Sequence, residues 1–434
     1  MTAELLHERA IVLDAHADVV LPETSPLYLG DDGQSKTAIS KLEAGGFDAV
    51  VMALATGPRP RTPEGRADAA AEVSAKLAAI RALVNANPEQ LMFAATSDQV
   101  RAAQDSGRVA IILGFQNALA FERDLSRIDE LASEGVRVFG LTHMGHNDFS
   151  DSSRPLFNGE TGEYEVTEEH GGLSDLGREA VLRISALGGI VDVSQMSKAA
   201  TLQAIDLSET PVIASHSNAK QLSDVTRNLT DEEIDRIGET GGVIHIAAFS
   251  AYLVDLSDPD MVASIRDVRI AAGLPETYSY PYELYWELDG DEAKRSFLGN
   301  MSALVGREDV ARMVDHIDYV VDRIGIDHVG IGTDFNHGGG IVGFDEADAA
   351  QNVTVELLAR GYSPDDIEKI WGDHQSADRP RFAEANETRR TTRPEITGSD
   401  EGWFRSRLPT GLSDRLHEAF MTRRDRRRVE SPEA

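Results

Sequence analysis

The chain lacks cysteine, long hydrophobic runs and any excess of positive charge, and each absence excludes a class of protein. With no cysteine among 434 residues, disulfides and thiolate chemistry are excluded, so a zinc site would need histidine and carboxylate ligands. There is no run of about 18 apolar residues and no basic-then-apolar N-terminus. This predicts neither a membrane span nor a signal peptide and favours the cytoplasm. A net charge of −32 argues against nucleic-acid and anionic-membrane partners.

The composition changes near residue 372. Hydrophobic residues make up 41% of the chain, which is enough for a sizeable core. The acidic surplus lies within residues 1–371, whereas the charge of the remaining residues is nearly balanced and their apolar periodicity fades. We therefore expect one domain over 1–372 and a low-periodicity, arginine-rich C-terminal tail over 373–434, with one short helix at 411–422.

Eight short apolar runs, rich in β-branched residues, alternate with helical patterns. The runs are continuous rather than alternating in polarity, as expected of strands buried on both faces. Eight strand–helix units predict a (β/α)8 TIM barrel. A doubly wound open sheet is the alternative, but no glycine-rich phosphate-binding motif follows any run. Helices are expected at 65–86, from its apolar periodicity, and at 173–188, 229–242 and 363–372, which also have capping residues. The strands are expected at 10–18, 48–56, 108–117, 136–143, 188–195, 211–217, 241–248 and 328–335.

A long insertion separates the seventh predicted strand from the eighth. It spans roughly eighty residues, far more than an ordinary strand–helix connection. Within it, the segment YSYPYELYW at 278–286 holds five aromatic residues among nine. Two interpretations stay open for these rings: a lid or dimer contact, or packing within the insertion.

Polar side chains stand at the ends of most predicted strands. The first run, IVLDAHADVV, carries Asp14, His16 and Asp18 at alternate positions, which places them on one face of a strand. Such residues are costly on a buried strand unless they are used, although a strand end that frays into solvent would also tolerate them. The strand ends of a (β/α)8 barrel converge on the catalytic mouth, so a site is predicted there. The other strand-end residues are Gln116, His143, Gln195, His216, His245 and Asp334.

Six motifs follow one another along residues 8–372. They are DAHAD, LTHMGHNDFSDSS, GGLSDLGREAV, GGIVDVSQMS, PVIASHSNAKQLSDVTRNLTD and HVGIGTDFNHG. Each motif alone is weak, but in this order and spacing they resemble the renal (membrane) dipeptidase family of metal-dependent amidohydrolase barrels. The resemblance implies a barrel that holds zinc ions at its mouth and hydrolyses dipeptides.

Five positions correspond to metal ligands of that family. The resemblance implies that His16 and Asp18 hold one zinc ion and that His216 is a ligand of the other. Gln116 stands where the family has a glutamate that bridges both ions, and Gln195 stands where it has a histidine. These replacements remove a negative charge and a good zinc donor, while two close zinc ions need an anion between them. We therefore expect a reduced site that holds one Zn²⁺ per chain.

The resemblance also implies the catalytic roles. His143 matches the histidine that hydrogen-bonds the scissile oxygen, and Arg227 matches the arginine that binds the carboxylate of the dipeptide. Asp334 matches the residue that takes a proton from the metal-bound water and passes it to the leaving amine. Asp334 is also the fourth candidate ligand of the single zinc. Asn336 and His337 stand where the family has a second aspartate, and Asn336 is assigned to substrate binding.

These observations favour a metal-dependent hydrolase that cleaves a small dipeptide or related amide with a free carboxylate. In a rival interpretation the protein is a tailoring enzyme that works without metal and uses Gln116 and Gln195 to hydrogen-bond its substrate. A third interpretation is a binding protein without turnover, but an inactive site has no need for His143, Arg227 and Asp334 together. The expected binding partner is a small dipeptide-like substrate. For the oligomeric state, a monomer and a homodimer both stay open.

Overall fold

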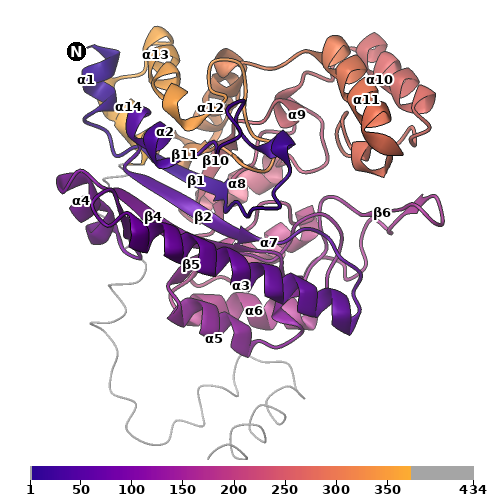
Figure 1. Ribbon diagram of the computed structural model, residues 1–434, viewed down its shortest axis with the longest axis horizontal. Coiled ribbons are helices and arrows are strands. Elements are labelled where there is room, and N and C mark those ends of the chain that lie inside the picture. Colours follow the sequence, from indigo (N-terminus) through magenta and orange to yellow (C-terminus); the bar gives the residue numbers. More distant parts are fainter. Residues whose placement is uncertain (1, 373–434) are drawn as a thin grey trace, which may run out of the picture. The chain divides into compact units, whose positions relative to one another are not determined.

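The computed structural model describes residues 2–372 of the chain. The tail predicted over 373–434 and its helix at 411–422 lie outside these residues. Within them, strands and helices alternate from the first strand to the last helix (Figure 1).

Eight parallel strands form a (β/α)8 barrel, which confirms the predicted fold. The barrel closes where the backbone N–H of Asp18 donates to the carbonyl of Phe335, at 2.9 Å, and that of Asp334 donates to the carbonyl of His16, at 2.9 Å. Each strand lies within a predicted run, because residues buried on both faces must be apolar throughout. In order around the barrel, the strands are β1 (Leu13–Asp18), β2 (Ala49–Ala55), β4 (Val109–Gln116), β5 (Val136–Gly140), β8 (Ile190–Asp192), β9 (Ile213–Ala214), β10 (Val243–Ala247) and β11 (Val329–Gly332).

The four helices predicted by range are all present, and their caps explain where they begin. Thr62 accepts from the backbone N–H of Gly65 at the start of one, and Ser174 accepts from that of Gly177 at the start of another. The carboxylate of Glu233 accepts from the backbone N–H of Thr230, which forms a capping box. These helices are α3 (Pro63–Ala86), α6 (Asp175–Ala186), α8 (Asp231–Glu239) and α14 (Pro364–Trp371).

Several shorter elements were not predicted. The strand β3 (Leu91–Phe93) pairs with β4 outside the barrel order, and β6 (Phe157–Asn158) and β7 (Glu163–Tyr164) form a small hairpin. Two or three residues are too few to show a periodic pattern. The remaining helices, of which α12 and η4 complete the segment between β10 and β11, are α1 (Ala3–His7), η1 (Pro26–Tyr28), α2 (Ile39–Ala44), α4 (Ser97–Asp105), η2 (Ala118–Phe121), α5 (Ser126–Ser133), α7 (Lys198–Leu207), α12 (Val310–Ile324), η4 (Ile326–His328), η5 (Ala347–Ala349) and α13 (Gln351–Ala359).

The insertion follows β10 and forms a small helical layer of its own. Tyr278, Tyr282, Tyr285 and Trp286 pack against the apolar cluster between its helices, which confirms the packing interpretation for these four rings. Tyr280 instead packs beside the barrel in a second cluster with Tyr252. The elements of the insertion are α9 (Ser250–Leu253), α10 (Pro259–Ala271), η3 (Tyr285–Glu287) and α11 (Gly290–Val305).

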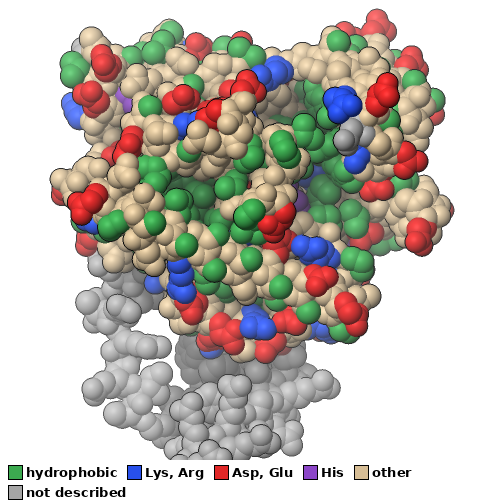
Figure 2. Space-filling model, in the orientation of Figure 1, with side chains coloured by type: hydrophobic (Ala, Val, Ile, Leu, Met, Phe, Trp, Pro, Cys, Tyr) green, Lys and Arg blue, Asp and Glu red, His purple; other side chains and the backbone are tan. Residues whose placement is uncertain are grey.

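The described surface carries both signs of charge. Figure 2 shows acidic side chains spread over the visible face with basic ones between them, rather than a single acidic patch. In the part of the chain that the structure describes, none of the helices has the length and apolar character that crossing a membrane requires. The cytoplasmic location stays a prediction.

Candidate metal and substrate site

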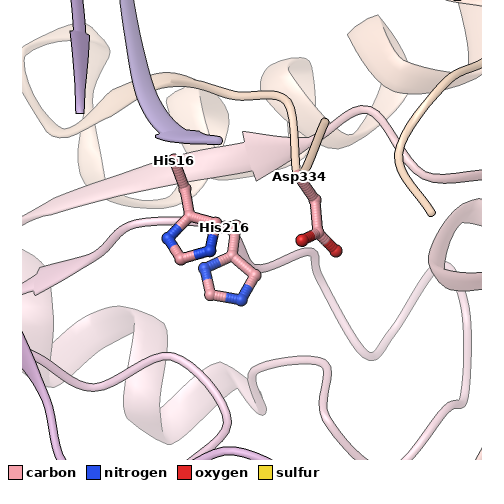
Figure 3. Close-up of side chains that lie close together, drawn as sticks. All are labelled: His16, His216 and Asp334. Atoms are coloured by element: carbon pink, nitrogen blue, oxygen red, sulfur yellow. The ribbon is translucent and has the colours of Figure 1, made fainter. Parts of the chain in front are cut away.

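Three potential metal ligands meet at the mouth of the barrel. His16 lies in the second half of β1, His216 follows β9 and Asp334 follows β11, so strands far apart in sequence bring them together. One donor atom of each lies within 4.8 Å of the others, and all three residues are buried. The two imidazole rings are stacked with centroids 3.8 Å apart, and the Asp334 carboxylate lies beside them (Figure 3). Two imidazoles and a carboxylate form a typical three-residue set for a zinc ion with an open position.

A hydrogen-bonded chain fixes the orientation of His216. The hydroxyl of Ser215 donates to Asp192 Oδ2, at 2.6 Å, and lies 2.8 Å from His216 Nδ1. Because a carboxylate only accepts, the hydroxyl hydrogen goes to Asp192 and His216 Nδ1 carries its own hydrogen. Burial and the neighbouring His16 hold the pKa of His216 well below its usual range. The ring is therefore neutral, with the lone pair of Nε2 turned away from Ser215.

Asp18 lies beside the three-residue group but outside it. One carboxylate oxygen is 3.5 Å from His16 Nε2, and the other is 3.1 Å from His337 Nδ1. Burial alone would raise the pKa of Asp18, but Lys76, His16 and His337 together hold it well below its usual range. The same carboxylate outweighs burial and raises the pKa of His16. Of the four predicted zinc ligands, His16, His216 and Asp334 come together. The carboxylate of Asp18 instead lies between His16 and His337.

Both glutamines at the predicted ligand positions are buried at the mouth. Gln116 ends β4, and its Nε2 has no hydrogen-bond partner among the described residues. Gln195 follows β8 with a left-handed backbone (φ 65°), and its Nε2 donates to His216 Nε2 at 3.1 Å. Its Oε1 has no partner among the described residues. Since unpaired buried amide atoms are costly, both side chains are suited to bind a ligand.

Asp334 and His143 have the protonation properties of a catalytic acid and base. Burial outweighs the nearby cations and raises the pKa of Asp334. Burial, His337 and Arg154 hold the pKa of His143 well below its usual range, so this imidazole is neutral. Its Nδ1 has no partner among the described residues. Asp334 also has a left-handed backbone (φ 58°), a strain that proteins retain mainly at functional sites.

Arg227 is a buried cation with no ion-pair partner among the described residues. Its side chain is 2% exposed, and none of its three guanidinium nitrogens has a hydrogen-bond partner among the described residues. The guanidinium carbon lies 4.0 Å over the ring of Tyr252. Burial lowers the pKa of Arg227 from its usual value. The arrangement leaves a complete fork of donors for an anionic ligand.

Comparison with known proteins identifies the family. The family model described as membrane dipeptidase (peptidase family M19) matches residues 1–375. The chain belongs to the membrane dipeptidase family. Over 288 residues it is 28% identical to dipeptidase tcpJ of Claviceps purpurea, which covers 65% of this chain and 53% of that protein. Over 297 residues it is 27% identical to dipeptidase verJ of Clonostachys rogersoniana, covering 68% and 60% respectively. The chain thus spans only about half of the length of such curated relatives.

Solved structures agree with this assignment. The probable dipeptidase PvdM from Pseudomonas aeruginosa is 33% identical, with a TM-score of 0.75 over 86% of this chain and 95% of that one. A metallopeptidase from Rhodobacter sphaeroides, liganded with a phosphinate mimic of the dipeptide L-Ala-D-Ala, is 20% identical. Its TM-score is 0.64, over 84% of this chain and 97% of that one, and this likeness shows the fold.

Two residues that the sequence singled out for the site make structural contacts in this member of the membrane dipeptidase family. Asn336 donates to the carbonyl of Asp18 and the hydroxyl of Thr37, and its oxygen accepts from the backbone of Lys36 and the hydroxyl of Ser35. The amide therefore joins two loops and has no free donor for a substrate, contrary to its predicted role.

His245 is the second of these residues. It lies inside the barrel, where the side-chain-free Gly330 leaves room for its ring, and its Nδ1 is 3.1 Å from the carbonyl oxygen of Ala214. It is a core histidine and does not belong to the three-residue metal group.

Sequence reasoning missed several residues that shape the site. Asp192 and Ser215 lie within the motifs that carry the family resemblance. A carboxylate and a hydroxyl at neighbouring strand ends could have indicated that they orient the site histidines. Lys76 donates to the carbonyl of Ala55 at 2.6 Å and acts on Asp18 from the side of a helix. Nothing in the helical pattern distinguishes this lysine from a solvent-exposed one. Arg154 was missed as well. It follows the SDSS segment in a loop, where the sequence pattern gives no sign that the side chain is buried.

Proposed function

We propose that the protein is a zinc-dependent dipeptidase that holds a single Zn²⁺ through His16, His216 and Asp334. The observation that carries the proposal is the pairing of this three-residue group with the buried, unpartnered guanidinium of Arg227. A cluster of metal ligands facing a dedicated anion-binding fork matches a small peptide with a free C-terminal carboxylate. The family assignment supports the same reaction class.

Each residue has a distinct task in this scheme. A zinc ion, when bound, acts as a Lewis acid and activates water for attack on the amide. Arg227 binds the terminal carboxylate and so fixes the scissile bond in front of the ligand group. The neutral His143 donates an N–H to the scissile oxygen as negative charge develops there. Asp334, whose pKa is raised by burial, accepts a proton and returns it to the leaving amine.

The carboxylate-binding role of Arg227 can be tested with substrate pairs. Arg227→Met should weaken binding of a dipeptide with a free carboxylate by about 1.5–3 kcal/mol, the range for a charged hydrogen bond. The C-terminally amidated dipeptide should hardly be affected. Arg123→Met provides a control, because Arg123 is an exposed arginine that pairs with Asp148. Equal losses for both substrates, measured as the Kd or KM, would rule out the role.

One observation favours the metal-free rival and keeps it as a second candidate. The amide of Gln195 donates to His216 Nε2, which is the lone pair that a metal would need. Elemental analysis of protein purified without added metal separates the candidates. One zinc per chain, with activity lost on chelation and restored by zinc, supports the dipeptidase. A metal-free protein that stays active would support the rival.

A further inference from the structure

A second buried arginine lies near Arg227. Arg154 is 3% exposed, and its Nε and Nη2 have no hydrogen-bond partner among the described residues. Within that part of the chain, no carboxylate lies at ion-pair distance from the guanidinium of either arginine. The guanidinium carbon of Arg154 lies 4.6 Å over the ring of Tyr280. Both arginines are therefore buried cations that rest on a tyrosine ring.

The two arginine–tyrosine pairs form one cluster. Tyr252, beneath Arg227, and Tyr280, beneath Arg154, meet edge to face with ring centroids 5.8 Å apart and an interplanar angle of 84°. Arg154 also lies close enough to disfavour the charged forms of Arg227 and His143. The insertion contributes Tyr280, so this chain's own additional segment helps to place the second cation beside the first.

Arg154 keeps its positive charge although it is buried. The nearby groups of Tyr280, Tyr252 and Glu283 outweigh the effect of burial and raise the pKa of Arg154 from its usual value. Glu283 Oε2 accepts from the backbone N–H of Ser279 and the hydroxyl of Tyr164 rather than from the guanidinium. The guanidinium of Arg154 therefore stays charged, with Nε and Nη2 unpartnered among the described residues and suited to an anionic ligand.

Arg269 shows how a structural arginine is treated in the same molecule. It is fully buried, yet its guanidinium donates to the carbonyls of Pro275, Pro281 and Glu283. Among the described residues, one guanidinium nitrogen of Arg269 (Nη2) has no partner, whereas two of Arg154 (Nε and Nη2) have none. Arg269 therefore organises the insertion through three carbonyls, and Arg154 keeps two donors for a ligand.

We propose that the substrate is a dianionic dipeptide whose C-terminal residue is aspartate or glutamate. Arg227 binds the α-carboxylate, and Arg154 binds the side-chain carboxylate of the same residue. The assignment rests on the proposed dipeptidase function for the place of Arg227. It goes beyond that function because it specifies the side chain that follows the scissile bond. The two carboxylates of one residue are separated by a single side chain, which suits two cations on touching rings.

The test measures binding without turnover. Reduced-amide analogues of Ala-Ala, Ala-Glu and Glu-Ala, in which the scissile C=O is a methylene group, are titrated calorimetrically into the full-length protein. We expect the Ala-Glu analogue to bind about 10- to 100-fold more tightly than the Ala-Ala analogue, as for a charged hydrogen bond. The Glu-Ala analogue should gain little. In Arg154→Gln the ratio of Ala-Glu to Ala-Ala affinity should fall to about one.

Two further variants keep the result interpretable. Arg154→Lys retains the charge but loses the planar fork, so an intermediate ratio is expected. Arg123→Gln, at an exposed arginine, should keep the full ratio. Equal binding of Ala-Ala and Ala-Glu by the wild type, or a preference that survives in Arg154→Gln, would overturn the proposal. If Arg154→Gln does not fold, the wild-type ratios and Arg154→Lys decide the question.

Failure of this inference and failure of the proposed function give different results. If the Ala-Glu analogue binds tightly through Arg154 but Ala-Glu itself is not hydrolysed, the acidic subsite stands and the hydrolase proposal fails. If dipeptides are hydrolysed with no preference for an acidic C-terminal residue, the hydrolase proposal stands and this inference fails.

Discussion

The two sides of the barrel mouth differ in how their polar side chains are held. Around the histidines, His16 and His216 lie against the hydroxyl of Ser215, which is itself held by Asp192 at the end of β8. On the side of β4 and β8, Gln116 and Gln195 have amide atoms without partners among the described residues. The histidine side is thus held by a chain of hydrogen bonds, whereas each glutamine keeps one amide atom without a partner among the described residues.

The largest expected effect comes from the carboxylate on the well-oriented side. Asp334→Asn should lower kcat for dipeptide hydrolysis by about 10²- to 10⁴-fold, the range for loss of a general acid–base group. The change keeps the size of the side chain but removes its ability to accept a proton. The measurement is steady-state kinetics, with Asp348→Asn on the η5 turn as a control. A loss of less than about tenfold would show that proton transfer does not depend on this side of the mouth.

Restoring the other side is the next test of the comparison. The double change Gln116→Glu, Gln195→His adds the missing charge and donor, so metal content should rise from about one to about two per chain, with increased dipeptidase activity. Each single change should do less, because the second ion then still lacks a ligand. Elemental analysis of the wild type, both single variants and the double variant decides the matter. Two zinc ions in the wild type would show that the two sides do not differ as described.

A smaller effect is expected from the partners that orient the histidines. Ser215→Ala removes the hydroxyl that bridges Asp192 and His216, so zinc affinity should fall by about 10- to 100-fold. Ser217→Ala is the matched control, since its hydroxyl donates to Ser194 Oγ, which accepts from the backbone N–H of His216 rather than from its ring. Competition with a chromogenic chelator gives the affinities. If both variants bind zinc as the wild type does, prior orientation does not explain why this side keeps its metal ligands.

The smallest effect should follow from removing the tail. Both sides of the mouth are built from residues 2–372, so truncation after Asp373 should leave zinc content and the thermal unfolding temperature unchanged. Differential scanning calorimetry and elemental analysis compare the two chain lengths. A large loss of stability would mean that residues beyond 373 pack on the barrel or on a partner subunit.

The fold and the polar residues at the barrel mouth were predictable from the sequence because both depend on strict local patterns. A strand buried on both faces must be apolar along its length, and a polar residue at its end stands out, as His16 and Asp334 do. The pairing of Asp18 with His337 was less accessible. It depends on a left-handed turn at Asn336, and single-residue backbone geometry leaves little trace in composition.

The remaining residues could not be predicted, for a different physical reason. The roles of Lys76, Arg154 and Tyr280 are set by which segments meet after the chain has folded. A lysine on a helix and an arginine in a loop are ordinary surface residues by pattern, and only burial without a counter-charge marks them. The bonds of Asn336 to loops from distant segments could not be predicted for the related reason that they form only after those segments meet.

The closing seam of the barrel also constrains how the protein is made. The backbone and hydroxyl of Thr333 both donate to Asp14, which lies 319 residues earlier, and this contact joins the first strand to the last. Contacts of such long sequence separation form late, because the chain between them must already be ordered. During synthesis, His16 leaves the ribosome long before Asp334 is added. The full ligand group therefore exists only in a nearly finished chain, and tight zinc uptake would report that the barrel has closed.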